Sequence, residues 1–514
     1  MIGRLSDSIA VRVLSALRRF LSALFDGSVV IAACRDCALA RLLRRWVSAS
    51  APLGDTLSAA ASRRLARAAW LDRTVGGSGL ARLWHGFCRI TRSSRLFGWI
   101  FCDGITGVLL TVIGLYAGID WLLRDAVTVP MLSSVWDELW MLICALWLWR
   151  QAAADGAAHT PRPTVLGYFV FLFLTLGLML IGIVSPYLNI AVSGYRAQCQ
   201  YLLWYFIVLR LLRGDKDAKR LYGLSVALAL VIALHGVYQY IVAVPIPAKW
   251  VDAAEQSVRT RVFSIFGSPN IMADYMVIFA PMCAALAYHA KKPSHRLLAW
   301  CAAGLCCVSC LFTMSRGGWA AMAVAIVIFA ILVDRRLLGA LLIAAVCSLA
   351  LPFVASRIGY LFTDEFTHAN SSAGREARWA IGMQYLQNSS PLFGYGLGMF
   401  GGAVAMQHKI YDHVYYFYLD NYYMKTLVEM GYLGLGAFLA MLASLFATGC
   451  RCLARAKKAE SRSAYAPMAG IFAGLCGVMA HCYFENIFEE PYMMAVFWTL
   501  AALMTYLGTY RKSS

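Results

Sequence analysis

The hydrophobic residues of this 514-residue chain gather into long blocks, which short polar segments separate. Each block is about 20 residues long, the length of a helix that crosses roughly 30 Å of hydrocarbon. The alternation of apolar and polar positions that is typical of transmembrane β-strands is not present. We therefore predict an all-α integral membrane protein with about twelve spans, near residues 98–123, 131–149, 165–184, 198–212, 221–244, 270–290, 296–314, 317–333, 337–355, 426–448, 466–485 and 490–508.

Composition agrees with this class, because 61% of the residues are hydrophobic and only 14% are charged, against about 25% charged in soluble proteins. The net charge of +19 lies mainly in the N-terminal region and in short loops. That distribution indicates orientation in a membrane by cytoplasmic basic loops, and we do not expect a nucleic-acid partner. Most cysteines lie inside apolar blocks, and the isolated C-x-x-C at 34–37 has no second pair, so no metal site is expected.

Residues 1–97 form a basic region with 16 arginines, five aspartates and neither lysine nor glutamate. Short amphipathic stretches in it fit helices that lie on an anionic membrane surface. The composition also resembles that of an organelle transit peptide. We interpret 1–97 as a basic, amphipathic, cytoplasmic N-terminal region, followed by a polytopic membrane domain over 98–514.

The basic loops between the predicted spans all fall on one side of the membrane. Segments 213–220, 291–296 and 451–462 are the clearest of them. The positive-inside rule then places both termini in the cytoplasm. Two longer segments, 245–269 and 356–425, are left on the external side. The second lies between the ninth and tenth predicted spans, and a loop of that length is usually functional.

Three arginines stand on the external side, against the charge trend: Arg261, Arg316 and Arg375, with Arg378 one helical turn after the last. Guanidinium groups bind phosphate with two parallel hydrogen bonds. The arrangement favours an anionic ligand just outside the bilayer. The alternative for each arginine is contact with lipid headgroups or pairing with a loop carboxylate.

Two helix starts accompany these arginines. Ser268 is a predicted N-cap with Pro269 as the first helical residue, and Ser315 is placed to cap the next external helix start. A helix N-terminus adds backbone donors and partial positive charge for an anion. Gly317 would let a ligand approach the backbone closely.

A second group of residues lies in 388–400 and 413–438. The glycines and Pro391 of the first stretch predict a tight loop. Asp420 precedes the tenth predicted span and is a candidate general base, or alternatively the N-cap of that helix. Glu429 is predicted to face the protein interior, where it could orient an arginine. Other external titratable groups rank lower, as surface or capping residues: His413, Glu365, Glu376, Glu485, Glu489 and Glu490.

Four stretches resemble the successive motifs of the O-antigen ligase and Wzy-type polysaccharide polymerase superfamily. They are RVFSIFGSPNIMADY (261–275), TMSRGGW (313–319), PLFGYGLGMF (391–400) and DNYYMKTLVEMGYLG (420–434). The resemblance covers about residues 160–510 and leaves the basic region aside. It implies a GT-C-type glycosyltransferase of the bacterial cytoplasmic membrane that needs no metal or cofactor. Its donor would be an undecaprenyl-pyrophosphate-linked glycan and its acceptor a glycan hydroxyl, with membrane lipids and other polysaccharide-assembly proteins as partners.

The resemblance also implies roles for individual residues. Arg261 and Arg316 would act in catalysis on the pyrophosphate, with Asp420 as base. Among the arginines the resemblance also implies a pyrophosphate contact for Arg375, and we expect further substrate contacts at Asn270, Gly317, Arg378, His413, Asn421 and Glu429. Ligases of the superfamily carry histidine directly before the asparagine of the last motif, where this chain has Asp420. This difference favours polymerisation of repeat units over ligation to a lipid or protein acceptor. A transporter or flippase for the same material is the alternative outside the enzymes.

Overall fold

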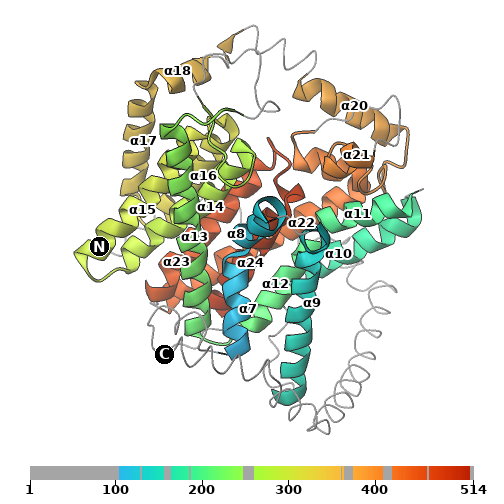
Figure 1. The fold of residues 1–514 in the computed structure, drawn as a ribbon, viewed down its shortest axis with the longest axis horizontal. Coiled ribbons are helices and arrows are strands. Elements are labelled where there is room, and N and C mark those ends of the chain that lie inside the picture. Colours follow the sequence, from blue (N-terminus) through green and yellow to red (C-terminus); the bar gives the residue numbers. More distant parts are fainter. Residues whose placement is uncertain are drawn as a thin grey trace, which may run out of the picture. The chain divides into compact units, whose positions relative to one another are not determined.

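The computed structural model of the chain describes residues 104–127, 130–155, 164–184, 187–246, 260–359, 362–363, 374–408, 419–459 and 462–509. Within these ranges the regular structure is helical and contains no β-strand (Figure 1). The predicted N-terminal region 1–97 lies outside the described residues, as do His413 and Glu365.

The chain divides by contacts into two units. The first unit comprises 1–82 and 149–159, and of it the structure describes only 149–155, the end of one helix. The second unit comprises 83–148 and 160–514 and contains all the other described residues. The described elements are α7 (Gly104–Gly114), α8 (Tyr116–Trp121), the π-helix η1 (Leu122–Ala126), α9 (Pro130–Asp155), α10 (Val165–Val184), α11 (Leu188–Gln198), η3 (Gln200–Leu202), α12 (Leu203–Leu211), α13 (Asp215–Ile241), α14 (Pro269–His289), α15 (Pro293–Phe312), α16 (Arg316–Leu332), α17 (Arg336–Leu349), α18 (Pro352–Gly359), α20 (Arg375–Gln387), α21 (Ala403–His408), α22 (Tyr422–Lys458), α23 (Arg462–His481), η7 (Ile487–Glu489) and α24 (Pro491–Thr509).

By length and composition, seven of the described helices can cross a membrane: α10, α13, α14, α15, α22, α23 and α24. An eighth span results if α7 is joined to α8 and η1, although these two halves are bent by 72°. The long apolar helices support a multi-pass membrane protein. The predicted number of twelve spans and the GT-C arrangement stay predictions.

Several predicted spans differ from the helices that form. The segment predicted as one span over 198–212 contains the end of α11, the short η3 and the nine-residue α12, which is too short to cross a bilayer alone. The segment predicted over 337–355 is divided between α17 and α18. Apolar composition alone does not show such breaks, because they depend on what each end of the helix packs against.

The centre of the fold is α14, which packs against α15, α16 and α23 (Figure 1). In its most apolar window, 89% of the residues are buried. Glycines of α23 allow the close approach: a Cβ on Gly470 would lie 2.7 Å from the carbonyl oxygen of Pro281, and one on Gly474 would lie 2.6 Å from that of Ile278. Small residues at this spacing are typical of packed membrane helices.

The glycine-rich stretch 388–400 forms the predicted tight loop, and it docks on a break in α22. At Gly431 the backbone of α22 has a φ of 68° and leaves the helical conformation. The loop supplies the missing bonds: the N–H groups of Tyr395 and Gly396 donate to the carbonyls of Val428 and Glu429, at 2.8 and 3.0 Å. A long-range loop thus satisfies backbone groups that the helix itself leaves open.

Substitution of Gly431 by alanine is expected to destabilise the folded protein. The backbone conformation at Gly431, with φ 68° and ψ −172°, is almost restricted to glycine and costs about 1–3 kcal/mol for a residue with a Cβ. The new methyl group would also collide with the carbonyl of Leu392. Thermal unfolding of the purified variant, followed by loss of its monodisperse chromatographic peak, measures the effect. Gly436→Ala in the same helix is the matched control, because a Cβ there meets no atom within 4 Å. Equal stability of the two variants would contradict the role of the break.

Candidate active site

The connection between α23 and α24, residues 482–490, is the point at which the candidate site assembles. The backbone N–H of Tyr422, at the start of α22, donates to the carbonyl of Cys482 at 2.8 Å. Arg375, at the start of α20, donates to the carbonyl of Phe484 at 3.3 Å. Asn270, in the first turn of α14, donates to the Glu485 carboxylate. The connection therefore joins the beginnings of three helices that are far apart in sequence.

Both predicted helix caps form. The Ser268 hydroxyl accepts from the N–H of Ile271 at 3.5 Å, and the Ser315 hydroxyl accepts from the N–H of Gly318 at 3.2 Å. The two helix starts touch, since a Cβ on Gly318 would collide with the side chain of Ala273. Two partially positive helix N-termini thus meet at one place.

Arg261 connects these two helix starts. Its Nε donates to the carbonyl of Thr313 at 3.2 Å, just before α16, and its terminal nitrogen donates to Oδ1 of Asn270 at 3.5 Å. Arg316 is the first residue of α16 and is partly buried. Sequence reasoning therefore predicted correctly that these two arginines belong to neighbouring helix starts.

A further arginine at this place was missed from the sequence. Arg357, on α18, is 5% exposed and donates to the carbonyl of Met314 at 2.7 Å. It lies in the segment 356–425, which is predicted to be external, and it opposes the predicted charge asymmetry as Arg261 and Arg316 do. The same reasoning that identified Arg261 and Arg316 could have found it.

Gly317 approaches a buried histidine. A Cβ at this position would lie 2.5 Å from Nε2 of His481, whose Nδ1 is 2.7 Å from a carboxylate oxygen of Asp274. Sequence reasoning missed this Asp–His pair. Its signal was the presence of ionisable residues in apolar spans, where burial is costly unless the groups are paired.

Asp420 lies opposite the two arginines of α20. Its carboxylate accepts from Arg378 at 2.7 Å, and its φ of +50° is a left-handed conformation that aspartate and asparagine tolerate better than most residues. The N-cap of α22 is Asn421, which accepts from the N–H of Met424 at 3.1 Å. The alternative that Asp420 itself caps the helix is therefore wrong.

Electrostatics distinguish the two carboxyl groups of the site. Burial raises the pKa of Asp420, while the charges of Arg378 and Arg375 oppose the rise. Burial, with the negative charge of Asp420 as the next cause, raises the pKa of Glu485 to about 7. A carboxyl group that titrates near neutral pH can exchange a proton with a substrate. Glu485, ranked as an ordinary surface residue from the sequence, is in fact a 7% exposed member of the site.

Glu429 faces the interior, as predicted, but its partner is a lysine rather than an arginine. The carboxylate is 1% exposed and accepts from Lys425 at 2.6 Å and from the backbone N–H of Phe400 at 3.1 Å. Gln198 also donates to it, and Glu489 lies 3.2 Å from the same lysine. This buried network holds the 388–400 loop against α22. A direct contact of Glu429 with substrate stays a prediction.

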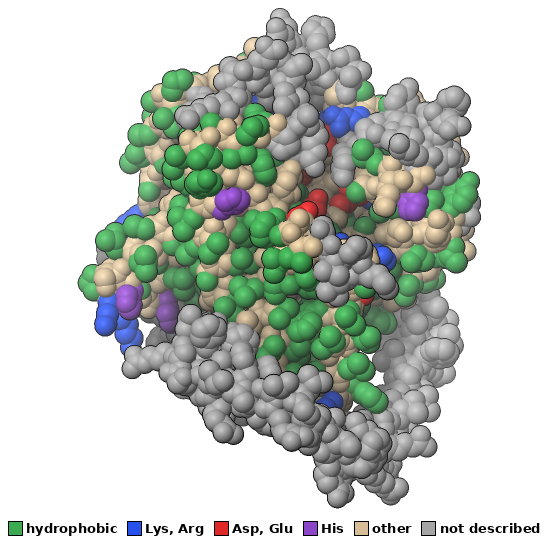
Figure 2. All heavy atoms as spheres, in the orientation of Figure 1, with side chains coloured by type: hydrophobic (Ala, Val, Ile, Leu, Met, Phe, Trp, Pro, Cys, Tyr) green, Lys and Arg blue, Asp and Glu red, His purple; other side chains and the backbone are tan. Residues whose placement is uncertain are grey.

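The face of the molecule that Figure 2 draws carries charged side chains within a largely apolar surface. Figure 2 shows acidic side chains gathered near the centre of this face, with basic side chains close to them and hydrophobic surface on either side. The described site contains several arginines and at least two carboxyl groups, of which Asp420 faces arginines and Glu485 is buried beside Asp420. Such a set can bind a doubly charged phosphate ester and accept a proton beside it.

Residues 301–439 match the family model described as O-antigen ligase. The match confirms the resemblance that the motifs indicated. It includes Arg316, Arg375 and Asp420, whereas Arg261 and Glu485 lie outside the matched range. No curated protein matches the chain.

Proposed function

We propose that this chain, whose residues 301–439 match the O-antigen ligase family, polymerises undecaprenyl-pyrophosphate-linked oligosaccharide repeat units. The observation that carries the proposal is the assembly of arginines, two helix N-termini and two carboxyl groups around residues 482–490. The reaction takes place on the external face of the bacterial cytoplasmic membrane. Both chain termini and the basic region 1–97 lie in the cytoplasm, and the chain crosses the membrane about twelve times in a GT-C-type arrangement.

The arginines act on the donor. Arg261, which contacts the first turn of α14, and Arg316, the first residue of α16, receive the pyrophosphate together with backbone N–H groups. The space beside Gly317 is taken by the ring of His481. Arg375 extends this positive surface on α20. During transfer, negative charge develops on the departing polyprenyl pyrophosphate, and donors already in place stabilise it without reorganisation.

Asp420 acts on the acceptor. The hydroxyl oxygen of a second glycan chain attacks the anomeric carbon of the donor sugar, and the bond from that carbon to the phosphate oxygen breaks. The hydroxyl proton passes to Asp420, which Arg378 orients, and the polyprenyl pyrophosphate leaves with the bonding electrons. Glu485, whose pKa is about 7, is the second group able to take or return the proton.

Asn270 and Asn421 complete the proposed substrate contacts. Asn270 bridges Arg261 and Glu485, so its position links the donor side to the proton-accepting side. Asn421 caps α22 and thereby sets the backbone that presents Asp420. Both asparagines position the charged groups of the site, and their places beside these groups also bring them into contact with the substrate.

Ligation to a lipid or protein acceptor is the second candidate, favoured by the name of the matching family. The presence of Asp420 in place of the histidine typical of ligases favours the polymerase. A flippase is less consistent with the site, because a transporter places its charged substrate groups near the membrane midplane. Here Arg316 and Arg375 begin helices, Asp420 lies two residues before α22, and Arg261 contacts the first turn of α14.

Incubation of the full-length protein with one defined lipid-linked repeat unit tests the proposal. We expect a ladder of longer lipid-linked chains and release of polyprenyl pyrophosphate, without any added acceptor or metal. Gel electrophoresis and mass spectrometry of the products measure this. A single transfer that requires an added lipid A core would indicate a ligase. Movement of the substrate across a vesicle membrane without a new glycosidic bond would reject the enzyme.

A further inference from the structure

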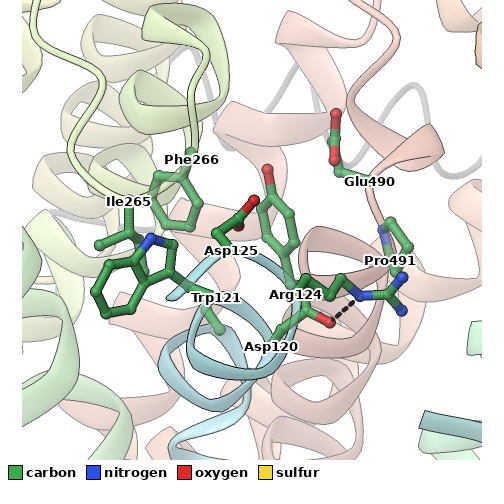
Figure 3. A pocket seen from close by; sticks show the side chains of 10 residues that line it. Asp120, Trp121, Arg124, Asp125, Ile265, Phe266, Glu490 and Pro491 are labelled. Atoms are coloured by element: carbon green, nitrogen blue, oxygen red, sulfur yellow. Dashed lines mark hydrogen bonds and ion pairs between the residues drawn. The ribbon is translucent and has the colours of Figure 1, made fainter. Parts of the chain in front are cut away.

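A cavity of about 260 Å³ lies between the helix formed by α8 and η1 and the start of α24. Aromatic and acidic side chains line it, those of Trp121, Phe266, Tyr492, Asp120, Asp125 and Glu490 among them. Figure 3 shows Trp121 and Asp125 on one side, Phe266 near them, and Glu490 with Pro491 across the space. The helix that carries Trp121 continues into the π-helix η1, and such segments are frequent at functional sites.

The cavity lies at the same end of the helices as the candidate active site, but it uses other side chains. Phe266 stands four residues before Asn270, and Glu490 stands five residues after Glu485 in the same connection. The charge of Glu485 also contributes to the raised pKa of Glu490. The cavity is therefore a neighbour of the pyrophosphate site rather than part of it.

The charge of the lining disfavours an anion. Three carboxyl groups, those of Asp120, Asp125 and Glu490, face one arginine. That arginine is already engaged: Arg124 lies 2.8 Å from Asp120 and 3.1 Å from Asp137. A phosphate group would meet net negative charge here, so the ligand differs from the one proposed for Arg261 and Arg316.

A metal ion and a purely apolar ligand fit poorly as well. Among the described residues, no three His, Cys, Asp or Glu side chains are grouped so as to hold a metal ion. An apolar ligand would remove water from the carboxyl groups without giving them hydrogen bonds, which is costly. The ligand must therefore offer several hydrogen-bond donors together with an apolar surface.

A sugar ring has both properties. Its hydroxyl groups donate to carboxylates, and its C–H faces pack on aromatic rings. Phe266 and Tyr492 stack with ring centroids 5.1 Å apart, and Trp121 is 38% exposed beside them. The carboxylate of Asp120 is held in place, because its Oδ1 accepts from Trp136 at 2.9 Å as well as from Arg124.

We propose that this cavity, lined by Trp121, Phe266 and Tyr492 and by the carboxyl groups of Asp120, Asp125 and Glu490, is a binding subsite for a neutral sugar ring. The assignment of this sugar ring to the glycan chain rests on the proposed function. The binding of a sugar ring in the cavity does not depend on that function. The cavity would hold a sugar next to the reacting ends and thereby set which repeat unit enters the site. Burial raises the pKa of Glu490 to about 7, with the charge of Glu489 as the next cause. This carboxyl group can therefore donate to or accept from a hydroxyl near neutral pH.

Direct binding of free sugars tests the proposal. The full-length protein, in lipid nanodiscs free of sugar detergents, is examined by saturation-transfer NMR with glucose, galactose, N-acetylglucosamine and N-acetylgalactosamine. We expect a saturation-transfer signal from at least one of these sugars. The signal should be lost in Trp121→Ala, and the affinity for the sugar should be at least tenfold weaker in Asp125→Asn. Asp125 is exposed, so its variant keeps the test valid if Trp121→Ala does not fold. Leu122→Ala is the matched control, because Leu122 is 45% exposed on the same helix and does not line the cavity.

The outcomes separate this proposal from the proposed function. Sugar binding that is equal in the wild type and in both cavity variants, or absent from the wild type, would overturn the subsite even if polymer forms. Trp121-dependent sugar binding that persists in Arg316→Ala would support the subsite even if no polymer forms. Weaker binding of inorganic pyrophosphate in Asp125→Asn, with unchanged sugar binding, would assign the cavity to the donor phosphate and reject the subsite.

Discussion

Replacement of Arg316 by alanine is expected to lower glycan transfer by at least about 10²–10³-fold, the loss typical of removing one donor that stabilises developing negative charge. Arg316 begins α16 directly beside the start of α14. Its guanidinium therefore adds to the two helix N-termini that we propose for the pyrophosphate. Release of polyprenyl pyrophosphate from a defined lipid-linked repeat unit measures the rate.

The matched variants make this prediction specific. Arg261→Ala should give a loss of similar size, and Arg316→Lys should recover little activity, because an ammonium group cannot form two parallel bonds to phosphate. Arg336→Ala, at the start of α17 and exposed, should retain normal turnover. Thermal unfolding of each variant shows whether the fold is kept. Normal turnover by Arg316→Ala and Arg261→Ala would remove the pyrophosphate site from this place.

Replacement of Asp420 by asparagine is expected to lower turnover by about 10²–10⁴-fold, the usual contribution of general-base catalysis, while donor binding is retained. Asparagine has the same size and also tolerates the positive φ at this position. Because Asn421 is the helix cap, the variant leaves the start of α22 capped. The measurement is turnover together with binding of the lipid-linked donor. Near-normal polymer formation by this variant would end the assignment of the base to Asp420.

The pH profile then separates Asp420 from Glu485. The pKa of Glu485 is about 7, so the carboxylate that can accept a proton becomes abundant only as the pH rises through about 7. If this group takes part, the wild-type rate increases over that range, and Glu485→Gln loses the increase. A normal rate in Asp420→Asn with a pH-independent residual rate in Glu485→Gln would make Glu485 the base.

The sequence alone determined the class of the protein and several local features. Blocks of about 20 apolar residues have few stable structures other than helices in a bilayer, because backbone groups must be satisfied within the segment. The N-caps Ser268 and Ser315 could also be predicted from the sequence, since an N-cap depends on a residue only three positions away. Arg261, Arg316 and Arg375 could be selected because their position opposed the charge asymmetry of the loops.

Tertiary structure decided which of these groups meet. Asp274 pairs with His481, more than 200 positions away, and Asn270 pairs with Glu485, 215 positions away. No local pattern encodes either pairing. The pKa of Glu485 follows from burial in the connection between α23 and α24, and sequence reasoning placed that residue on the surface.

The N-cap of α22 shows that sequence patterns can fail to decide even between two adjacent residues. Asp420 and Asn421 are both good capping residues, and only the positive φ of Asp420 moves the cap to the next position and leaves the carboxylate for Arg378. Glu429 was predicted to be internal because a charge in lipid is costly, but its pairing with Lys425 and with the backbone of Phe400 depends on the docked loop. Local rules depend on residues within one helical turn, whereas the contacts that build a site depend on how helices distant in sequence pack.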